Sequence, residues 1–146
     1  MNPTILDSIA VSAIIQLVIN IIKIDPKNKV ILVTSAEPAE GKTTTSINIA
    51  YTFAQTEAKV ILVDCDLRKP RVHRYLKYDR DKGVSNVLCG FCKLDEVINK
   101  NVFGNLDCIW AGEIPTSSTE LLMSDEMSNM LEELSKRYDY VFLDTP

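Results

Sequence analysis

Residues 30–54 read VILVTSAEPAEGKTTTSINIAYTFA and decide the fold of this chain. The apolar run Val30–Thr34 predicts a strand, a turn follows it, and the segment from about Thr43 to Ala54 predicts a helix. Between turn and helix stands Gly41-Lys42-Thr43, where backbone N–H groups can cradle phosphate, the lysine can neutralise its charge and the threonine can hold Mg²⁺. The strict phosphate-loop pattern requires glycine where this chain has Ala36, so the nucleotide site is predicted from the motif in its strand-turn-helix context.

Aspartates end two further apolar runs of the sequence. Val60–Asp64 reads VILVD and is soon followed by Asp66, and Tyr140–Asp144 reads YVFLD. Carboxylates at the carboxyl ends of parallel strands face the crevice in which α/β sheets bind ligands. Asp64 taken alone is equally suited to capping a turn. Residues suited to binding phosphate or metal thus follow three of the predicted strands, and their agreement predicts one site for nucleotide and Mg²⁺. In that site Asp144 would hold the metal directly or through water.

The rest of the chain fits the same α/β architecture. A fourth apolar run, Leu106–Ala111, predicts another strand, and such nearly continuous runs are typical of a parallel sheet covered on both faces. A helix before the last strand is predicted from apolar residues at helical spacing, Met127, Met130, Leu131, Leu134 and Tyr138. Ser117 and Glu120 predict a capping box in front of it. We expect one domain over residues 29–146, preceded by a helical extension over residues 1–28.

Length and charge exclude several classes of protein. The chain has 146 residues, of which 46% are hydrophobic and 25% charged, so it can bury a core and is not a disordered tail or a fibre. Lysine and arginine number 16 against 20 acidic residues, a net charge of −4. This balance gives no electrostatic reason to expect nucleic acid as a partner, and any phosphate should be bound locally.

The cysteines indicate a reducing compartment. The chain has four, Cys65, Cys89, Cys92 and Cys108, and no recognisable secretion signal precedes them. Cys89 and Cys92 form a C-x-x-C pair, which is either a redox pair, half of a zinc site or without function. A zinc site would need two more ligands, and His73 is the only histidine in the sequence.

The N-terminal segment is the one place where the sequence raises the question of a membrane. Its uncharged run, residues 8–22, is 15 residues long, which is shorter than the 18 or more that a spanning helix needs. Polar residues follow one stripe of the predicted amphipathic helix: Ser8, Ser12, Gln16, Asn20 and Lys23. The helix therefore packs on its own domain or on a partner, or it associates with a membrane surface through its apolar face and the lysines that follow.

Taken together, these motifs resemble the bacterial tyrosine kinases that regulate capsular and exopolysaccharide synthesis, above all the separate cytoplasmic kinase subunit of Gram-positive bacteria. The resemblance covers residues 29–146. It rests on VTSAEPAEGKTTTSINIA (33–50) as Walker A, ILVDCDLRKP (61–70) as Walker A′ and YDYVFLDTP (138–146) as Walker B. GEIPTSSTELL (112–122) is similar to the family's proline-bearing loop that leads into a helix.

The resemblance implies a P-loop NTPase fold of the MinD/ParA type and a transferase that moves a phosphoryl group from Mg-ATP to protein tyrosine. It implies nucleotide-binding residues Glu40, Gly41, Lys42, Thr43 and Thr44. It implies metal-binding residues Thr43, Asp64 and Asp144, and catalytic residues Lys42, Asp64 and Asp66. Phosphoryl transfer depends on positioning and charge neutralisation, and a carboxylate suits the acceptance of the tyrosine hydroxyl proton.

The resemblance also implies where the protein works and with what. We expect a cytoplasmic protein held at the inner face of the membrane through a membrane adaptor of polysaccharide export, with protein tyrosines as substrates and no nucleic acid. The family's N-terminal helix uses an E-x-x-R-x-x-R pattern in self-association, and here the aligned positions are Ser12, Ile15 and Val18. A homo-oligomer therefore remains an alternative, but we do not expect a ring formed through this helix.

Two other departures bear on activity. Ala39 stands where the family usually has glycine, and a position that needs a positive φ would be strained by alanine. The sequence ends at Pro146, directly after the Walker B strand, where the family continues through further strands to a tyrosine-rich tail. We therefore expect a C-terminally incomplete kinase domain with an open apolar sheet edge and weak or absent kinase activity on its own.

Two alternatives from other classes remain. A MinD/ParA-type ATPase shares the fold, but its additional loop lysine would fall on Glu37. A non-catalytic or weakened nucleotide-binding or interaction module is harder to separate from a kinase by sequence. A basic patch after Walker A′ is either a solvated surface or a contact for phosphate or an acidic partner tail; it comprises Arg68, Lys69, Arg71 and Arg74.

Overall fold

The computed structural model describes residue 27, residues 29–33 and residues 41–146. The helix predicted over residues 1–28 and the turn predicted before Gly41 lie outside these residues, apart from Lys27. Everything below concerns the described residues.

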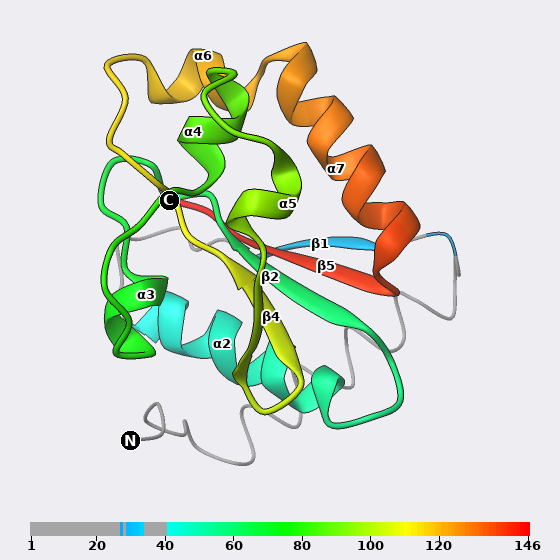
Figure 1. Cartoon of the computed structure of the whole chain (residues 1–146). Coiled ribbons are helices and arrows are strands. Elements are labelled where there is room, and N and C mark those ends of the chain that lie inside the picture. Colours follow the sequence, from blue (N-terminus) through cyan, green and yellow to red (C-terminus); the bar gives the residue numbers. More distant parts are fainter. Residues whose placement is uncertain (1–26, 28, 34–40) are drawn as a thin grey trace.

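A five-stranded sheet forms the centre of the molecule (Figure 1). In spatial order its strands are β1 (Val30–Val33), β5 (Tyr140–Asp144), β2 (Val60–Asp64), β4 (Leu106–Ile109) and β3 (Asn99–Phe103). The first four run parallel to one another. They are the four strands predicted from the apolar runs: β2 and β5 have the predicted bounds, β4 is two residues shorter, and β1 is described as far as Val33.

The fifth strand corrects the expectation of a purely parallel sheet. β3 pairs antiparallel with β4 through a short hairpin. Gly104 at the turn has φ of +58°, a backbone conformation that glycine adopts without strain. β3 reads NKNVF and forms an edge of the described sheet, where one side of the strand needs no apolar cover. Its polar sequence lacks the apolar run that marks the other four strands.

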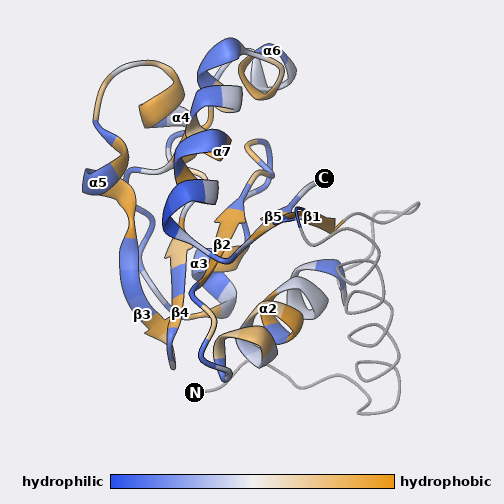
Figure 2. Ribbon diagram, turned by 90° about the vertical axis from the view of Figure 1, so that its right-hand side faces the viewer, coloured by the Kyte–Doolittle hydropathy of each residue, from blue (hydrophilic) through white to orange (hydrophobic). Residues whose placement is uncertain are grey.

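Helices cover both faces of the sheet. On one face lie α2 (Gly41–Ala54) and α3 (Val72–Tyr75), and on the other lie α4 (Val84–Leu88), α5 (Leu94–Val97), α6 (Ser118–Leu122) and α7 (Asp125–Arg137) (Figure 1). Successive residues of β2 accordingly enter different cores: Ile61 and Val63 pack with the α7 side, and Val60 and Leu62 with the α2 side. Burial on both faces is the reason that the first four residues of β2 are all apolar, and Figure 2 shows the strand largely in orange.

Helix α7 is correctly predicted in place but not in its cap. Ser117 precedes α6 instead, and its side chain makes no capping hydrogen bond. The N-cap of α7 is Ser124, whose Oγ accepts a hydrogen bond from the backbone N–H of Met127 at 3.2 Å. The predicted capping box is wrong because Ser117 precedes α6, a separate short helix. The sequence pattern does not show the break between α6 and α7.

Strand β1 lies at the other edge of the described sheet. Its hydrogen-bonded neighbour there is β5, and Leu32 is 59% exposed. None of the helices within residues 27, 29–33 and 41–146 has the length and apolar character needed to cross a membrane.

Candidate active site

The first part of the candidate site is the N-terminus of α2. The helix starts at Gly41, directly after residues 34–40, which the structure does not describe, and its first backbone N–H groups have no partner within the helix. Lys42 is next, with a side chain that is 12% exposed, and Thr43 and Thr44 are both buried. A helix N-terminus of this kind attracts anions through its unpaired N–H groups and its dipole. Predicted nucleotide-binding Glu40 lies outside the described residues, as do Ala36, Glu37 and Ala39.

Asp144, at the carboxyl end of β5, ties this helix to the sheet. The Thr43 hydroxyl donates to Asp144 Oδ2 at 3.1 Å, and Lys42 Nζ lies 3.9 Å from Asp144 Oδ1. The structure therefore brings Asp144 to Lys42 and Thr43, which precede it by about 100 positions, and all three were predicted to hold phosphate or metal. Their assembly follows from the parallel sheet, in which the strands before α2 and at the chain's end are neighbours.

Ser46 also belongs to this cluster, and it was missed at the level of sequence. It is fully buried, and its Oγ lies 2.9 Å from Asp144 Oδ1 and 3.1 Å from the Lys42 carbonyl oxygen, as donor to both. The available signal was helical spacing, because Ser46 stands three positions after Thr43 and so shares its face of the helix.

Asp64 lies opposite Asp144 in the sheet. The two residues are paired in register at the ends of β2 and β5, and Asp64 is fully buried. Its carboxylate accepts three backbone hydrogen bonds, from the N–H groups of Asp66 at 3.0 Å and of Arg71 and Val72 at 3.2 Å each. The side chain thus caps the turn after β2 and also lies beside Asp144, and its role toward the metal stays a prediction.

Burial raises the cost of ionising both carboxylates, and the charge of Asp144 adds to that cost at Asp64. Burial, and then the charge of Asp144, raises the pKa of Asp64 to about 7, although the three backbone N–H groups oppose the shift. Burial also raises the pKa of Asp144, against the opposing effects of Lys42, Ser46 and Thr43. One lysine is therefore too little positive charge for this pair, and an added cation would stabilise both ionised forms.

The donor set at this point fits Mg²⁺. A threonine hydroxyl and carboxylate oxygens are hard ligands, and Mg²⁺ is ordinarily held by one or two carboxylates together with waters and substrate phosphates. No group of three or more His, Cys, Asp or Glu residues within the described ranges is arranged to hold a metal by itself. Thr43, Asp144 and Asp64 would hold the ion here in company with phosphate oxygens.

Asp66 stands at the rim of the same site. It is half-buried, its charge contributes to the raised pKa of Asp144, and its Oδ1 accepts the backbone N–H of Lys69 at 3.1 Å. Within the described residues its second oxygen accepts no hydrogen bond. A carboxylate oxygen placed in this way is available to a hydroxyl group that enters from solvent.

The C-x-x-C pair takes no part in this site. All four cysteines are free, Cys89 is exposed and Cys92 packs against the α7-side core. Burial raises the pKa of Cys65 and of Cys108, so both thiols stay protonated in the core.

The chain is similar in sequence and structure to known proteins. A family model described as an AAA domain matches residues 28–146. "Tyrosine-protein kinase YwqD" of Bacillus subtilis is 38% identical over 123 residues, which are 84% of this chain and 52% of the relative. The solved kinase domain of the Escherichia coli tyrosine kinase ETK superposes with a TM-score of 0.85 at 34% identity, covering 94% of this chain and 53% of that one.

A more distant structure shares the fold. The septum site-determining protein MinD of Pyrococcus horikoshii, solved in complex with Mg-ADP, is 25% identical with a TM-score of 0.68, covering 81% of this chain and 49% of its own. The P-loop NTPase fold predicted from the motifs is thereby confirmed. The present chain spans about half the length of YwqD and a smaller share of other curated relatives.

Proposed function

The chain belongs to the bacterial tyrosine kinases and carries an AAA domain over residues 28–146, and from that premise we propose that it binds Mg-ATP and transfers the γ-phosphoryl group to a protein tyrosine. One observation carries the proposal. Lys42, Thr43 and Asp144 are in mutual contact at the N-terminus of α2, with Asp64 in register beside Asp144. This is an arrangement suited to a nucleoside triphosphate and its metal.

Each residue has a role that follows from its position. Lys42 neutralises charge on the β- and γ-phosphates, and the N–H groups of Gly41 and the residues after it, with Thr44 in the first turn, hold phosphate oxygens. Thr43, Asp64 and Asp144 hold Mg²⁺, which, when bound, offsets the charge that develops on the phosphate oxygens. Ser46 orients the Asp144 carboxylate through its hydrogen bond. Glu40 stays a predicted contact of the nucleotide.

The transfer itself requires one proton acceptor. The tyrosine oxygen forms a bond to the γ-phosphorus as the bond between that phosphorus and the bridging oxygen of ADP breaks. The phenol proton goes to a carboxylate, and Asp66 has an oxygen that accepts no hydrogen bond from the described residues. The products are phosphotyrosine and ADP.

The biological setting is proposed from relatives. One of them, from Klebsiella pneumoniae, is named "Putative tyrosine-protein kinase in cps region" and is 37% identical over 123 residues, although the chain covers 17% of its length. We place this protein in the control of capsular or exopolysaccharide synthesis. It would act in the cytoplasm at the inner face of the membrane, through a membrane adaptor, on protein tyrosines.

Calorimetry with Mg²⁺ and a non-hydrolysable ATP analogue tests the first step. Wild type is expected to bind, Lys42→Ala to lose binding, and Lys136→Ala, an exposed lysine on α7, to bind as wild type does. Absence of binding by a folded wild-type chain would overturn the proposal.

Transfer of labelled γ-phosphate to a glutamate-tyrosine copolymer, with and without the cytoplasmic segment of a membrane adaptor, tests the second step. We expect transfer that Asp66→Asn reduces at least tenfold while analogue binding persists. Binding without transfer under all conditions would identify a nucleotide-binding module instead. Phosphate release without tyrosine labelling would identify an ATPase of the partitioning type.

A further inference from the structure

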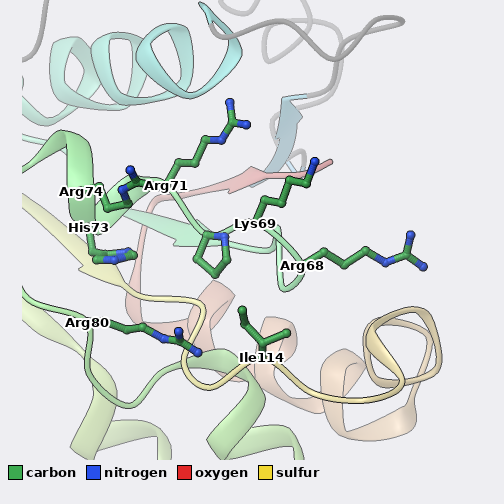
Figure 3. Close-up of a pocket in the computed structure, with 8 residues that line it drawn as sticks. Arg68, Lys69, Arg71, His73, Arg74, Arg80 and Ile114 are labelled. Atoms are coloured by element: carbon green, nitrogen blue, oxygen red, sulfur yellow. The ribbon is translucent and has the colours of Figure 1, made fainter.

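A second hollow lies beside the carboxyl end of β2 (Figure 3). It has a volume of about 320 Å³, which is in the range of small-ligand pockets, roughly 300–1,000 Å³. Figure 3 shows His73 and Arg74 on one side of the hollow, and Arg80 and Ile114 on the other. The pocket is thus built from three segments of the chain: residues 68–74, residue 80 and the loop after β4.

The lining is strongly and one-sidedly cationic. It contains no acidic side chain and five cations, Arg68, Lys69, Arg71, Arg74 and Arg80. None of the five has an ion-pair partner among the residues that the structure describes. On α7, by contrast, Arg137 is paired with both Asp95 and Glu133. An unpaired cluster repels itself, and a bound anion removes that repulsion.

His73 supplies an independent sign of a ligand. It lines the pocket, is 7% exposed, and its Nδ1 is buried without any hydrogen-bond partner. Its ring packs edge-on against Trp110. Burial, and then the charges of Arg74 and Arg80, lower its pKa, so the imidazole is neutral at pH 7. Buried polar atoms are ordinarily paired, so an unpaired imidazole nitrogen in the wall of a cationic hollow is unusual.

An apolar element completes the lining. Ile114 is 52% exposed although it is a large aliphatic side chain, and Pro70 borders the same space. A single phosphate or sulfate ion would use the arginines and leave this apolar side unused. A phosphate carried on an aromatic ring uses both, because arginine forks bind phosphate oxygens and the ring can pack on aliphatic surface.

We propose that this pocket binds the phosphotyrosine side chain of a protein, with the phosphate on the arginines and the ring against Ile114 and Pro70. The assignment of phosphotyrosine rests on the proposed function, of which it is the product. The pocket is joined to the proposed catalytic site, because Asp64 accepts the backbone N–H groups of Arg71 and Val72 in the pocket-forming segment. A substrate with several tyrosines would remain docked by one phosphorylated tyrosine as another enters the site.

Fluorescence anisotropy of a labelled phosphotyrosine peptide tests the pocket directly. The titration is run with the whole chain in excess Mg-ADP, so that the nucleotide site is occupied. We expect binding that free phosphotyrosine displaces, and that the unphosphorylated peptide and inorganic phosphate displace at least tenfold less well. Arg80→Gln is expected to weaken binding at least fivefold, because an arginine–phosphate contact is charge-assisted.

Lys82→Gln is the matched control, since Lys82 is exposed, lies two positions from Arg80 and does not line the pocket. An equal loss in Lys82→Gln would show attraction by general charge and overturn the proposal. Equal binding of a phosphoserine peptide would overturn the assignment of phosphotyrosine.

Calorimetry with the ATP analogue on the same variants separates this proposal from the proposed function. Arg80→Gln should bind the analogue as wild type does, and Lys42→Ala should bind the phosphopeptide as wild type does. Binding of the analogue without binding of the phosphopeptide would overturn only the proposed phosphotyrosine pocket. Binding of the phosphopeptide without binding of the analogue would overturn only the proposed nucleotide site.

Discussion

Asp64 and Asp144 stand in register at the ends of two hydrogen-bonded parallel strands, both buried, with Lys42 beside Asp144 as the nearby cation. Burial in the core destabilises the charged form of each carboxylate, and the raised pKa of each expresses that cost. The sheet maintains the pair because burial of the strands' apolar residues on both faces stabilises the fold that brings them together. The pair is therefore matched to a cation that arrives with the nucleotide.

The stability of the nucleotide-free chain should fall as the pH rises from about 4 to about 7. In the unfolded chain Asp64 titrates near its ordinary pKa of 3.8, and in the folded chain near 7, so between these values the folded state binds more protons. The free energy of unfolding then decreases with pH, by about 4 kcal/mol at most, and levels off above pH 7. Urea unfolding at pH 5, 6, 7 and 8 in EDTA measures this slope.

Asp64→Asn is the matching variant for that slope. Its residue 64 cannot ionise, so its stability should fall less steeply with pH than that of wild type, and the remaining slope comes from Asp144, whose pKa is also raised. Equal slopes in wild type and Asp64→Asn would contradict the assignment of the raised pKa to Asp64.

Asp144→Asn should weaken nucleotide binding only where Mg²⁺ is present. The amide keeps much of the shape but removes the charge that holds the metal, and we expect at least a tenfold loss of affinity for the ATP analogue. In EDTA, affinity should change by less than threefold. Calorimetry with and without Mg²⁺ makes the comparison, with Glu132→Gln on the exposed face of α7 as control. The same loss in EDTA would argue against a metal role for Asp144.

Ser46→Ala should reduce both stability and metal-dependent binding. The substitution removes the hydroxyl that donates to Asp144 Oδ1 in a fully buried position, which should cost about 1 kcal/mol of unfolding free energy. With its carboxylate less firmly oriented, Mg-dependent analogue affinity should drop by a few-fold. Ser128→Ala, an exposed serine on α7, provides the baseline. Wild-type affinity in Ser46→Ala would remove Ser46 from the site.

The two serines that compete as the cap of α7 can be distinguished by stability alone. Ser124→Ala should destabilise the chain by about 1 kcal/mol, because the Met127 N–H loses its acceptor. Ser117→Ala should cost clearly less, since its side chain makes no capping hydrogen bond. Paired urea melts decide the matter, and a larger loss at Ser117 would restore the cap predicted from sequence.

The local sequence pattern was sufficient to predict those site residues that lie at the end of a single strand. An apolar run buried on both faces must read as a continuous apolar segment, so β2 and β5 could be placed with the aspartates that end them. Gly41-Lys42-Thr43 could be placed at a helix start for the same local reason. Ser46 was missed because its helical spacing from Thr43 shows only a shared face, and its role follows from its acceptor, Asp144, which lies about 100 positions away.

The sequence by itself determined the α/β class, the four parallel strands and the residues at their carboxyl ends, because these follow from which short segments are apolar and where each one stops. Only the tertiary structure decided that β3 pairs antiparallel, that Ser124 caps α7, and that residues 68–74 meet Arg80 and Ile114 around a cationic pocket. Those features depend on contacts between residues far apart in the chain. Their free energy comes from packing and pairing that no local window of the sequence contains.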